Sequence, residues 1–206
     1  SSSGQNFIGV GGNVGHIAPK FGGSCIGFDG DSDYLYTTFS AGAGAGGFGT
    51  GTYTIDCWIY LTSHVTNNII CDFDKASGGD YFTFRVNQRG HANDRRLEWQ
   101  HPLDPDLASS GPLELNRWYH VAIVREGTST GQAKMYLDGA LQGVGTDATN
   151  WNDLTKLYIG SLNESLSGTG HKFNGFIDEF RISTAAEWTA NFTPPTAAYS
   201  DCLLYT

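Results

Sequence analysis

Hydrophobic and polar residues alternate along this chain in short runs with a period of two, and no segment shows the 3.6-residue period of an amphipathic helix. Clusters of Gly, Asp, Asn and Ser separate the runs, as expected for turns between strands. The pattern predicts an all-β protein with little helix. The expected strands are residues 24–28, 33–37, 52–61, 68–73, 81–86, 96–100, 118–125, 133–137, 156–160 and 173–182.

Two of these segments carry more detail. Residues 118–125 (WYHVAIVR) are largely apolar on both alternating faces, which predicts a strand in the middle of a sheet that is covered on both sides. Asp138 and Gly139 separate two β-prone arms, and both residue types tolerate the positive φ of a type I′ turn, so a tight hairpin is expected. By contrast, residues 41–51 (AGAGAGGFGTG) are of low complexity and predict a loop.

Composition supports one large β-sandwich. The 206 residues include 28 glycines, 39% hydrophobic residues and only 16% charged residues. The predicted domain is 1–206, with 1–20 and 197–206 as terminal segments that could pair with another subunit. The formal net charge of −9 leaves no basic stripe for nucleic acid, and no apolar run is long enough for membrane insertion.

Cysteine usage does not indicate a disulfide scaffold. Cys25, Cys57, Cys71 and Cys202 are few and widely spaced, and no pair has the spacing of zinc ligands. Cys25 and Cys57 lie within apolar runs, which favours buried free thiols. At least one disulfide remains the alternative.

Several motifs together resemble a known family. Residues 173–183 (FNGFIDEFRIS) are followed by FTPPT at 192–196 and preceded by KFGGSCIGFDGDSDYL at 20–35 and NRWYHVAIVREGT at 116–128. In this order they resemble laminin-G-like (concanavalin A-like lectin/glucanase) jelly-roll domains of the kind found in bacteriophage tail and virion proteins. The resemblance implies a two-sheet antiparallel jelly-roll sandwich. Such sandwiches bind glycans, hydrolyse them or build particles, so the function must come from a site.

Hydrolysis is not expected. Laminarinase-like relatives carry Glu-x-Asp-x-x-Glu on one strand, so that alternate acids project into a cleft, and nothing in this chain matches that motif. Asp178 and Glu179 are adjacent, and adjacent residues of a regular strand point to opposite faces. No G-x-S-x-G motif occurs either. We therefore predict a protein that is not an enzyme, with no catalytic residues.

No cofactor is expected, apart from a structural calcium ion that remains open. Residues 29–33 (DGDSD) offer alternate carboxylates, but Tyr34 stands where an EF-hand needs Gly. The resemblance implies that Asp178, with Asp29 or Asp31 nearby, could bind one calcium. The alternative is a solvated turn plus a strand aspartate that caps backbone N–H groups.

A glycan site is expected where aromatic rings and hydrogen-bonding side chains gather in loops. The candidates lie in residues 91–106 and near residue 151, although a Trp in a β-sandwich is also commonly a core residue, as we expect of Trp58 and Trp118. The candidate glycan-binding residues are His91, Arg95, Trp99, His101, Asp104 and Trp151.

The final segment, residues 201–206 (DCLLYT), reads as an apolar strand and contributes Cys202, Leu203, Leu204 and Tyr205. Either it closes a sheet of its own subunit or, like the segment near Phe7, it pairs with the open edge of a neighbouring copy. Two N-x-S/T sequons, at Asn163 and Asn191, are possible N-glycosylation sites.

Together these patterns predict a non-catalytic, extracellular or virion-associated structural module. We expect it to self-assemble through sheet edges into an oligomer, fibre or filament, or to join a larger virion or tail assembly. The alternative is a lectin-like module that binds carbohydrate or a cell surface.

Overall fold

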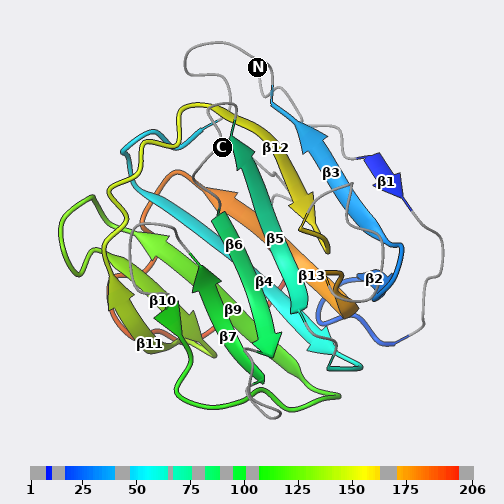
Figure 1. Ribbon diagram of the computed structural model, residues 1–206. Helices are drawn as coiled ribbons and strands as arrows, with labels where there is room; N and C mark the ends of the chain where they lie inside the picture. The colour runs from blue at the N-terminus through cyan, green and yellow to red at the C-terminus, as the bar shows by residue number, and fades with distance from the viewer. Residues whose placement is uncertain are drawn as a thin grey trace.

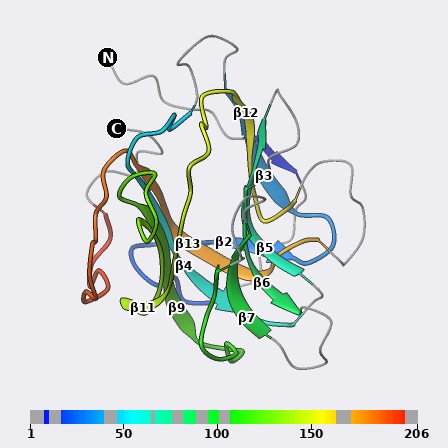
Figure 2. The ribbon, with the colours of Figure 1, turned by 60° about the vertical axis from the view of Figure 1, so that its left-hand side comes forward.

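The computed structural model describes residues 8–10, 17–39, 47–64, 67–75, 82–88, 95–100, 107–162 and 171–199, and these form two stacked antiparallel sheets (Figures 1 and 2). The described residues contain no helix, and therefore none that could cross a membrane. The predicted all-β jelly-roll sandwich is confirmed.

One sheet has seven strands in the order β1-β3-β12-β5-β6-β7-β8, and the other has six in the order β11-β10-β9-β4-β13-β2. The bounds in the first sheet are β1 Ile8–Val10, β3 Tyr34–Thr38, β5 Asn67–Lys75, β6 Phe82–Gln88, β7 Arg95–Gln100, β8 Leu107–Ala108 and β12 Leu154–Ile159. Those in the second sheet are β2 Ile26–Asp29, β4 Tyr53–Leu61, β9 Trp118–Arg125, β10 Ala133–Leu137, β11 Ala140–Gly145 and β13 Asn174–Ser183.

The period of two along each strand decides which side chains meet between the sheets. In β4, Ile55, Cys57 and Ile59 are fully buried in the core, while Asp56 and Trp58 project to the outer face of the six-stranded sheet. The strand β9 lies between β10 and β4 and is buried over nearly its whole length. The prediction of a central strand covered on both sides is confirmed.

The predicted hairpin is also confirmed. Asp138 and Gly139 connect β10 to β11 with φ values of 48° and 76°, as a type I′ turn requires. In the described part of the chain Cys25, Cys57 and Cys71 are free thiols, and burial raises the pKa of both Cys57 and Cys71 well above the usual value. Cys202 lies outside the described residues.

One expectation about an individual residue is corrected. Trp118 is only half-buried and lies on the outer face of the six-stranded sheet, so it is not a core residue. Trp58 is buried as expected, on that same outer face, where Phe21 and His120 pack against it. Ile8–Val10 forms the short strand β1 beside β3 of its own sheet, whereas Phe7 lies outside the described residues, and pairing of this segment with a neighbouring copy stays a prediction.

Candidate functional site

A bulge in β13 shapes the polar and apolar features described below. Glu179 has a φ of 53°, and the pairing of β13 with β4 shifts register between Asp178 and Arg181. Both Asp178 and Glu179 therefore line the same cavity. The expectation that their side chains point to opposite faces is wrong, because it assumed a regular strand.

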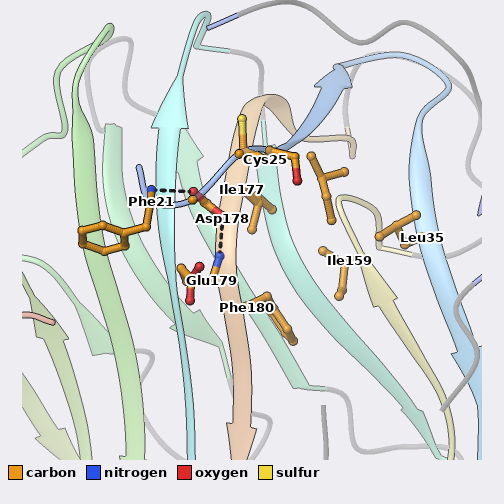
Figure 3. Close-up of a pocket in the computed structure, with 12 residues that line it drawn as sticks. Phe21, Cys25, Leu35, Ile159, Ile177, Asp178, Glu179 and Phe180 are labelled. Atoms are coloured by element: carbon orange, nitrogen blue, oxygen red, sulfur yellow. Dashed lines mark hydrogen bonds between the residues drawn. The ribbon is translucent and has the colours of Figure 1, made fainter. Parts of the chain in front are cut away.

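That cavity lies between the two sheets, beside β13, and has a volume of about 490 Å³ (Figure 3). Its apolar lining includes Leu35 and Ile159 from the seven-stranded sheet and Ile177 and Phe180 from β13. Residues 21–26 form another part of the lining, and they include the half-buried thiol of Cys25. Burial, together with the nearby Asp178 carboxylate, raises the pKa of Cys25. The space suits apolar groups better than sugars.

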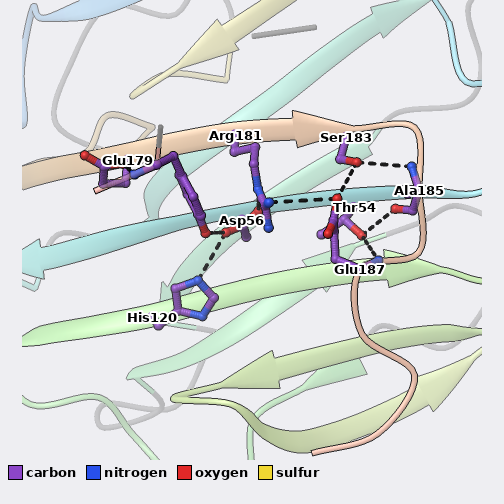
Figure 4. Close-up of polar contacts among 9 residues, drawn as sticks. Thr54, Asp56, His120, Glu179, Arg181, Ser183, Ala185 and Glu187 are labelled. Carbon is purple, nitrogen blue, oxygen red and sulfur yellow. Dashed lines mark hydrogen bonds and ion pairs between the residues drawn. The ribbon is translucent and has the colours of Figure 1, made fainter. Parts of the chain in front are cut away.

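A buried polar network lies on the outer face of the six-stranded sheet (Figure 4). The Asp56 carboxylate is fully buried and accepts hydrogen bonds from Arg181 Nε at 2.9 Å, from His120 Nε2 at 3.1 Å and from the Tyr199 hydroxyl. Burial and the neighbouring Asp56 raise the pKa of Tyr199, so the phenol stays protonated and donates. The network joins β4, β9 and β13 to the end of the described chain.

Residues 184–199, which we call the C-terminal strap, cover this network. Figure 2 shows them in orange to red, running along the outer side of the layer that contains β4, β9 and β13. The rings of Trp188 and Phe192 stack with centroids 3.9 Å apart, and the His120 ring meets the two edge-on at 5.5 and 5.6 Å. Trp188 and Phe192 pack on Ala122, Val124 and Tyr136 to form a second small apolar core. Among the described residues, this arrangement attaches the strap to the sheet.

Another part of the same face carries an aromatic strip, defined here as Tyr60, Trp118 and Phe176. These residues lie directly opposite one another on the neighbouring strands β9, β4 and β13. The Tyr60 ring lies 5.5 Å from that of Trp118 and 6.1 Å from that of Phe176, both edge-on. Tyr60 and Trp118 are half-buried, so part of each ring is accessible.

Sequence reasoning missed this strip because residues 118–125 are apolar on both faces, which resembles a strand in the core. One signal was available. Tyr60 and Trp58 are out of phase with Ile55, Cys57 and Ile59, so only one of these two sets can face the other sheet.

The predicted glycan-binding residues do not form a site in the described structure. Trp99 and Trp151 are 2% and 0% exposed, and both rings pack edge-on or tilted against Phe82 in the core. Neither ring can stack on a sugar. The interpretation that one face of β7 is wet fails because Glu98 is buried with Arg85 as its partner. Arg95 is exposed, while His91, His101 and Asp104 lie outside the described residues.

The three candidate calcium ligands are not brought together. Asp178 Oδ2 accepts the backbone N–H groups of Lys20 at 2.8 Å and Phe21 at 3.1 Å. Asp29 Oδ1 accepts the backbone N–H groups of Asp31 and Ser32. Partial burial acts to raise the pKa of Asp29, but hydrogen bonds such as these lower it, and the net shift is downward. Within the described ranges no group of three or more His, Cys, Asp or Glu side chains is placed to hold a metal ion. The observed contacts are those of an aspartate turn and a strand aspartate that caps backbone N–H groups.

The other candidate residues are placed only in part. Asn191 is exposed, and its side-chain oxygen accepts the backbone N–H of Leu141 at 2.9 Å, while the sequon at Asn163 lies outside the described residues. The predicted assembly residues Cys202, Leu203, Leu204 and Tyr205 also lie outside them.

Two acids that sequence reasoning passed over lie at alternate positions of β5, on the outer face of the seven-stranded sheet. Asp72 is buried, and its carboxylate accepts the Thr83 hydroxyl at 2.5 Å. Burial raises the pKa of Asp72 well above its usual value. Asp74 is the second acid and also has a partner. The motif sought in the sequence required Glu-x-Asp-x-x-Glu and so did not single them out.

Residues 29–187 match a family model described as the concanavalin A-like lectin/glucanases superfamily, Laminin_G_3. The chain belongs to this family. The resemblance drawn from the sequence is confirmed at that level, whereas the bacteriophage tail and virion context stays a prediction. No match was found among curated proteins.

Solved structures support the same fold. A candidate carbohydrate binding protein from Bacteroides ovatus superposes with a TM-score of 0.60 at 20% identity, over 80% of this chain and 44% of that one. Domain 4 of AbnA, an extracellular GH43 arabinanase from Geobacillus stearothermophilus, was solved in complex with arabinotriose. It superposes with a TM-score of 0.57 at 17% identity, over 86% of this chain and 81% of that one. Domains LG4-5 of the mouse laminin α1 chain superpose with a TM-score of 0.54 at 17% identity, over 82% of this chain and 44% of that one. The chain thus spans less than half of the Bacteroides and laminin chains.

Proposed function

We propose that this chain is a non-catalytic, extracellular carbohydrate-binding module whose sugar contact is the exposed part of the Tyr60 and Trp118 rings of the aromatic strip, next to the buried ring of Phe176. The observation that carries the proposal is the placement of three rings on adjacent strands at one end of the six-stranded sheet, with Tyr60 and Trp118 partly exposed. Aromatic ring faces stack on the C–H surfaces of sugars, and a flat sheet holds such rings in fixed positions.

Two of the similar structures support this choice of ligand class. One is described as a candidate carbohydrate binding protein, and the other is a domain in complex with arabinotriose. The strip itself contributes only aromatic side chains, so it offers binding without an acid or a nucleophile. We therefore place the chain with the binding members of its family and not with the hydrolases.

The test is binding to a glycan array, followed by titration calorimetry with the strongest ligands and with arabinotriose. Trp118→Ala should weaken binding about 10-fold or more, because one stacked ring contributes about 0.5–1.5 kcal/mol beyond its buried area. Its melting temperature should change little, because Trp118 is half-buried on an outer face.

Tyr60→Ala should weaken binding in the same way. Tyr34→Ala is its matched control, because Tyr34 is also a half-buried tyrosine but lies on β3 in the other sheet. If Trp118→Ala retained full affinity, or if Tyr34→Ala removed binding while Tyr60→Ala did not, the strip would not be the site.

Self-assembly through sheet edges, the primary expectation from the sequence, stays a prediction. It depends on residues 201–206, which lie outside the described residues.

A further inference from the structure

One edge of the six-stranded sheet is incompletely paired. The edge strand β2 pairs with β13 only from Asn174 to Ile177. From Asp178 to Ser183, the described residues place no strand against that side of β13. An open edge presents unpaired backbone N–H and C=O groups to any extended segment that can reach it.

The apolar cavity lies beside this open edge. Ile177 and Phe180 of β13 line it together with Leu35 and Ile159 of the facing sheet (Figure 3). Its volume of about 490 Å³ can hold more than one side chain. Protein interiors are normally close-packed, so an apolar space of this size between two sheets favours an apolar occupant.

The last described residue, Tyr199, is bonded to a residue that lines the same cavity. The backbone N–H of Tyr199 donates to the Glu179 carboxylate at 2.7 Å, and Glu179 lines the cavity. The Tyr199 hydroxyl donates to the buried Asp56, which anchors the residue a second time. The residues that follow, SDCLLYT, can extend by ~3.3–3.6 Å each, so they can reach roughly 23–25 Å from Tyr199.

We propose that residues 201–206 of the same chain dock along the open edge of β13 and place leucine side chains in this cavity. Successive residues of a strand face opposite sides, so one of the adjacent Leu203 and Leu204 faces inward in either register. The occupant is the chain's own segment because Tyr199 tethers it to Glu179, which lines the cavity. A tether of this kind gives an effective concentration in the millimolar range, which a second copy at micromolar concentration does not match.

Cys25 provides a direct probe because its half-buried thiol lines the cavity. In a Cys202→Ser background the other two cysteines, Cys57 and Cys71, are fully buried and should not react in the folded protein. The experiment measures the rate at which a maleimide labels Cys25, with mass spectrometry to locate the label. Full-length protein is compared with Leu203→Asp/Leu204→Asp and with a chain ending at Ser200.

Both variants should label about 10-fold faster or more, because labelling then needs no local opening of the docked segment. The charge control is Thr128→Asp/Thr130→Asp in the exposed β9–β10 connection, which does not line the cavity and should label like the parent. Size-exclusion chromatography should show a monomer throughout. Equal labelling rates in all four proteins would overturn the proposal. Protection that appears only as protein concentration and oligomer size increase would assign the docked segment to a second copy and would overturn it equally.

Discussion

Asp72 shows how a single buried side chain can govern the pH response of this protein. Its carboxyl group is 3% exposed, and the Thr83 hydroxyl is a hydrogen-bond donor to it. Burial raises its pKa well above the usual value, and the Thr83 bond only partly offsets this. Between the unfolded value of about 3.9 and the raised folded value, the folded state binds more protons than the unfolded state. Stability is therefore highest below this window and falls as the pH rises through it.

Asp72→Asn removes this titration and keeps an oxygen that can accept the Thr83 hydroxyl. We expect the variant to melt at least ~2 °C above the wild type at pH 7–8, with the difference vanishing toward pH 4. Thermal unfolding followed by circular dichroism across this range measures the effect. Asp31→Asn, at an exposed position, is the control and should change the unfolding free energy by less than about 0.5 kcal/mol at any pH. A variant destabilised equally at pH 4 and pH 8 would contradict the raised pKa of Asp72, because its effect would not depend on proton binding.

Among the elements, the turn of the β10–β11 hairpin also holds the C-terminal strap. Gly139 has a φ of 76°, and a Cβ atom at this position would lie 2.0 Å from the carbonyl oxygen of Phe192. The backbone N–H of Phe192 donates to the Gly139 carbonyl at 2.9 Å. Backbone therefore packs directly on backbone here, and only glycine leaves room for it.

Gly139→Ala should be less stable than the wild type by about 1–2 kcal/mol for the left-handed backbone, and by about 1–3 kcal/mol more for the displaced strap. Gly131→Ala is the matched control, because Gly131 has a φ of 81° but nothing within 4 Å of its would-be Cβ. Gly131→Ala should lose only the about 1–2 kcal/mol that the left-handed backbone costs. Urea unfolding gives both values, and equal losses would mean that the contact with Phe192 does not stabilise the strap.

The elements that the sequence predicted correctly are those set by local chemistry. The short alternating runs and the Asp138–Gly139 turn depend on a few adjacent residues, and both were found. The bulge at Glu179 and the outer-face position of Trp118 were not found, because they depend on neighbours distant in the sequence. Likewise, the polar neighbours of Trp99 made it a candidate sugar contact, with a core position as the alternative, and the pairing of Glu98 with Arg85 allows Trp99 to be buried.

At the scale of the whole molecule, two buried aspartates hold different parts together. Asp147 accepts the Tyr53 hydroxyl at 2.7 Å, Arg125 Nη1 at 3.1 Å and the Trp151 indole N–H at 3.0 Å, and all four side chains are at most 1% exposed. This cluster joins β4 and β9 of one sheet to the segment that leads into β12 of the other. Asp56, in contrast, joins the outer face of one sheet to the C-terminal strap.

Asp147→Ala leaves the buried Arg125 with only backbone carbonyls as acceptors, and Asp56→Ala leaves His120 Nε2 without its carboxylate. Removing one member of a buried ion pair costs about 3–5 kcal/mol. The two variants should lose stability in different parts of the molecule, and hydrogen exchange of backbone amides measures which parts these are. Asp147→Ala should lower protection in both sheets together, because the cluster spans them. Asp56→Ala should lower protection chiefly in residues 184–199, because the strap can detach while the core between the sheets stays packed. If Asp56→Ala instead lowered protection equally in β5 and β6 of the far sheet, the strap and the sandwich would unfold as one unit, and the anchoring of Tyr199 would be a global feature of the fold.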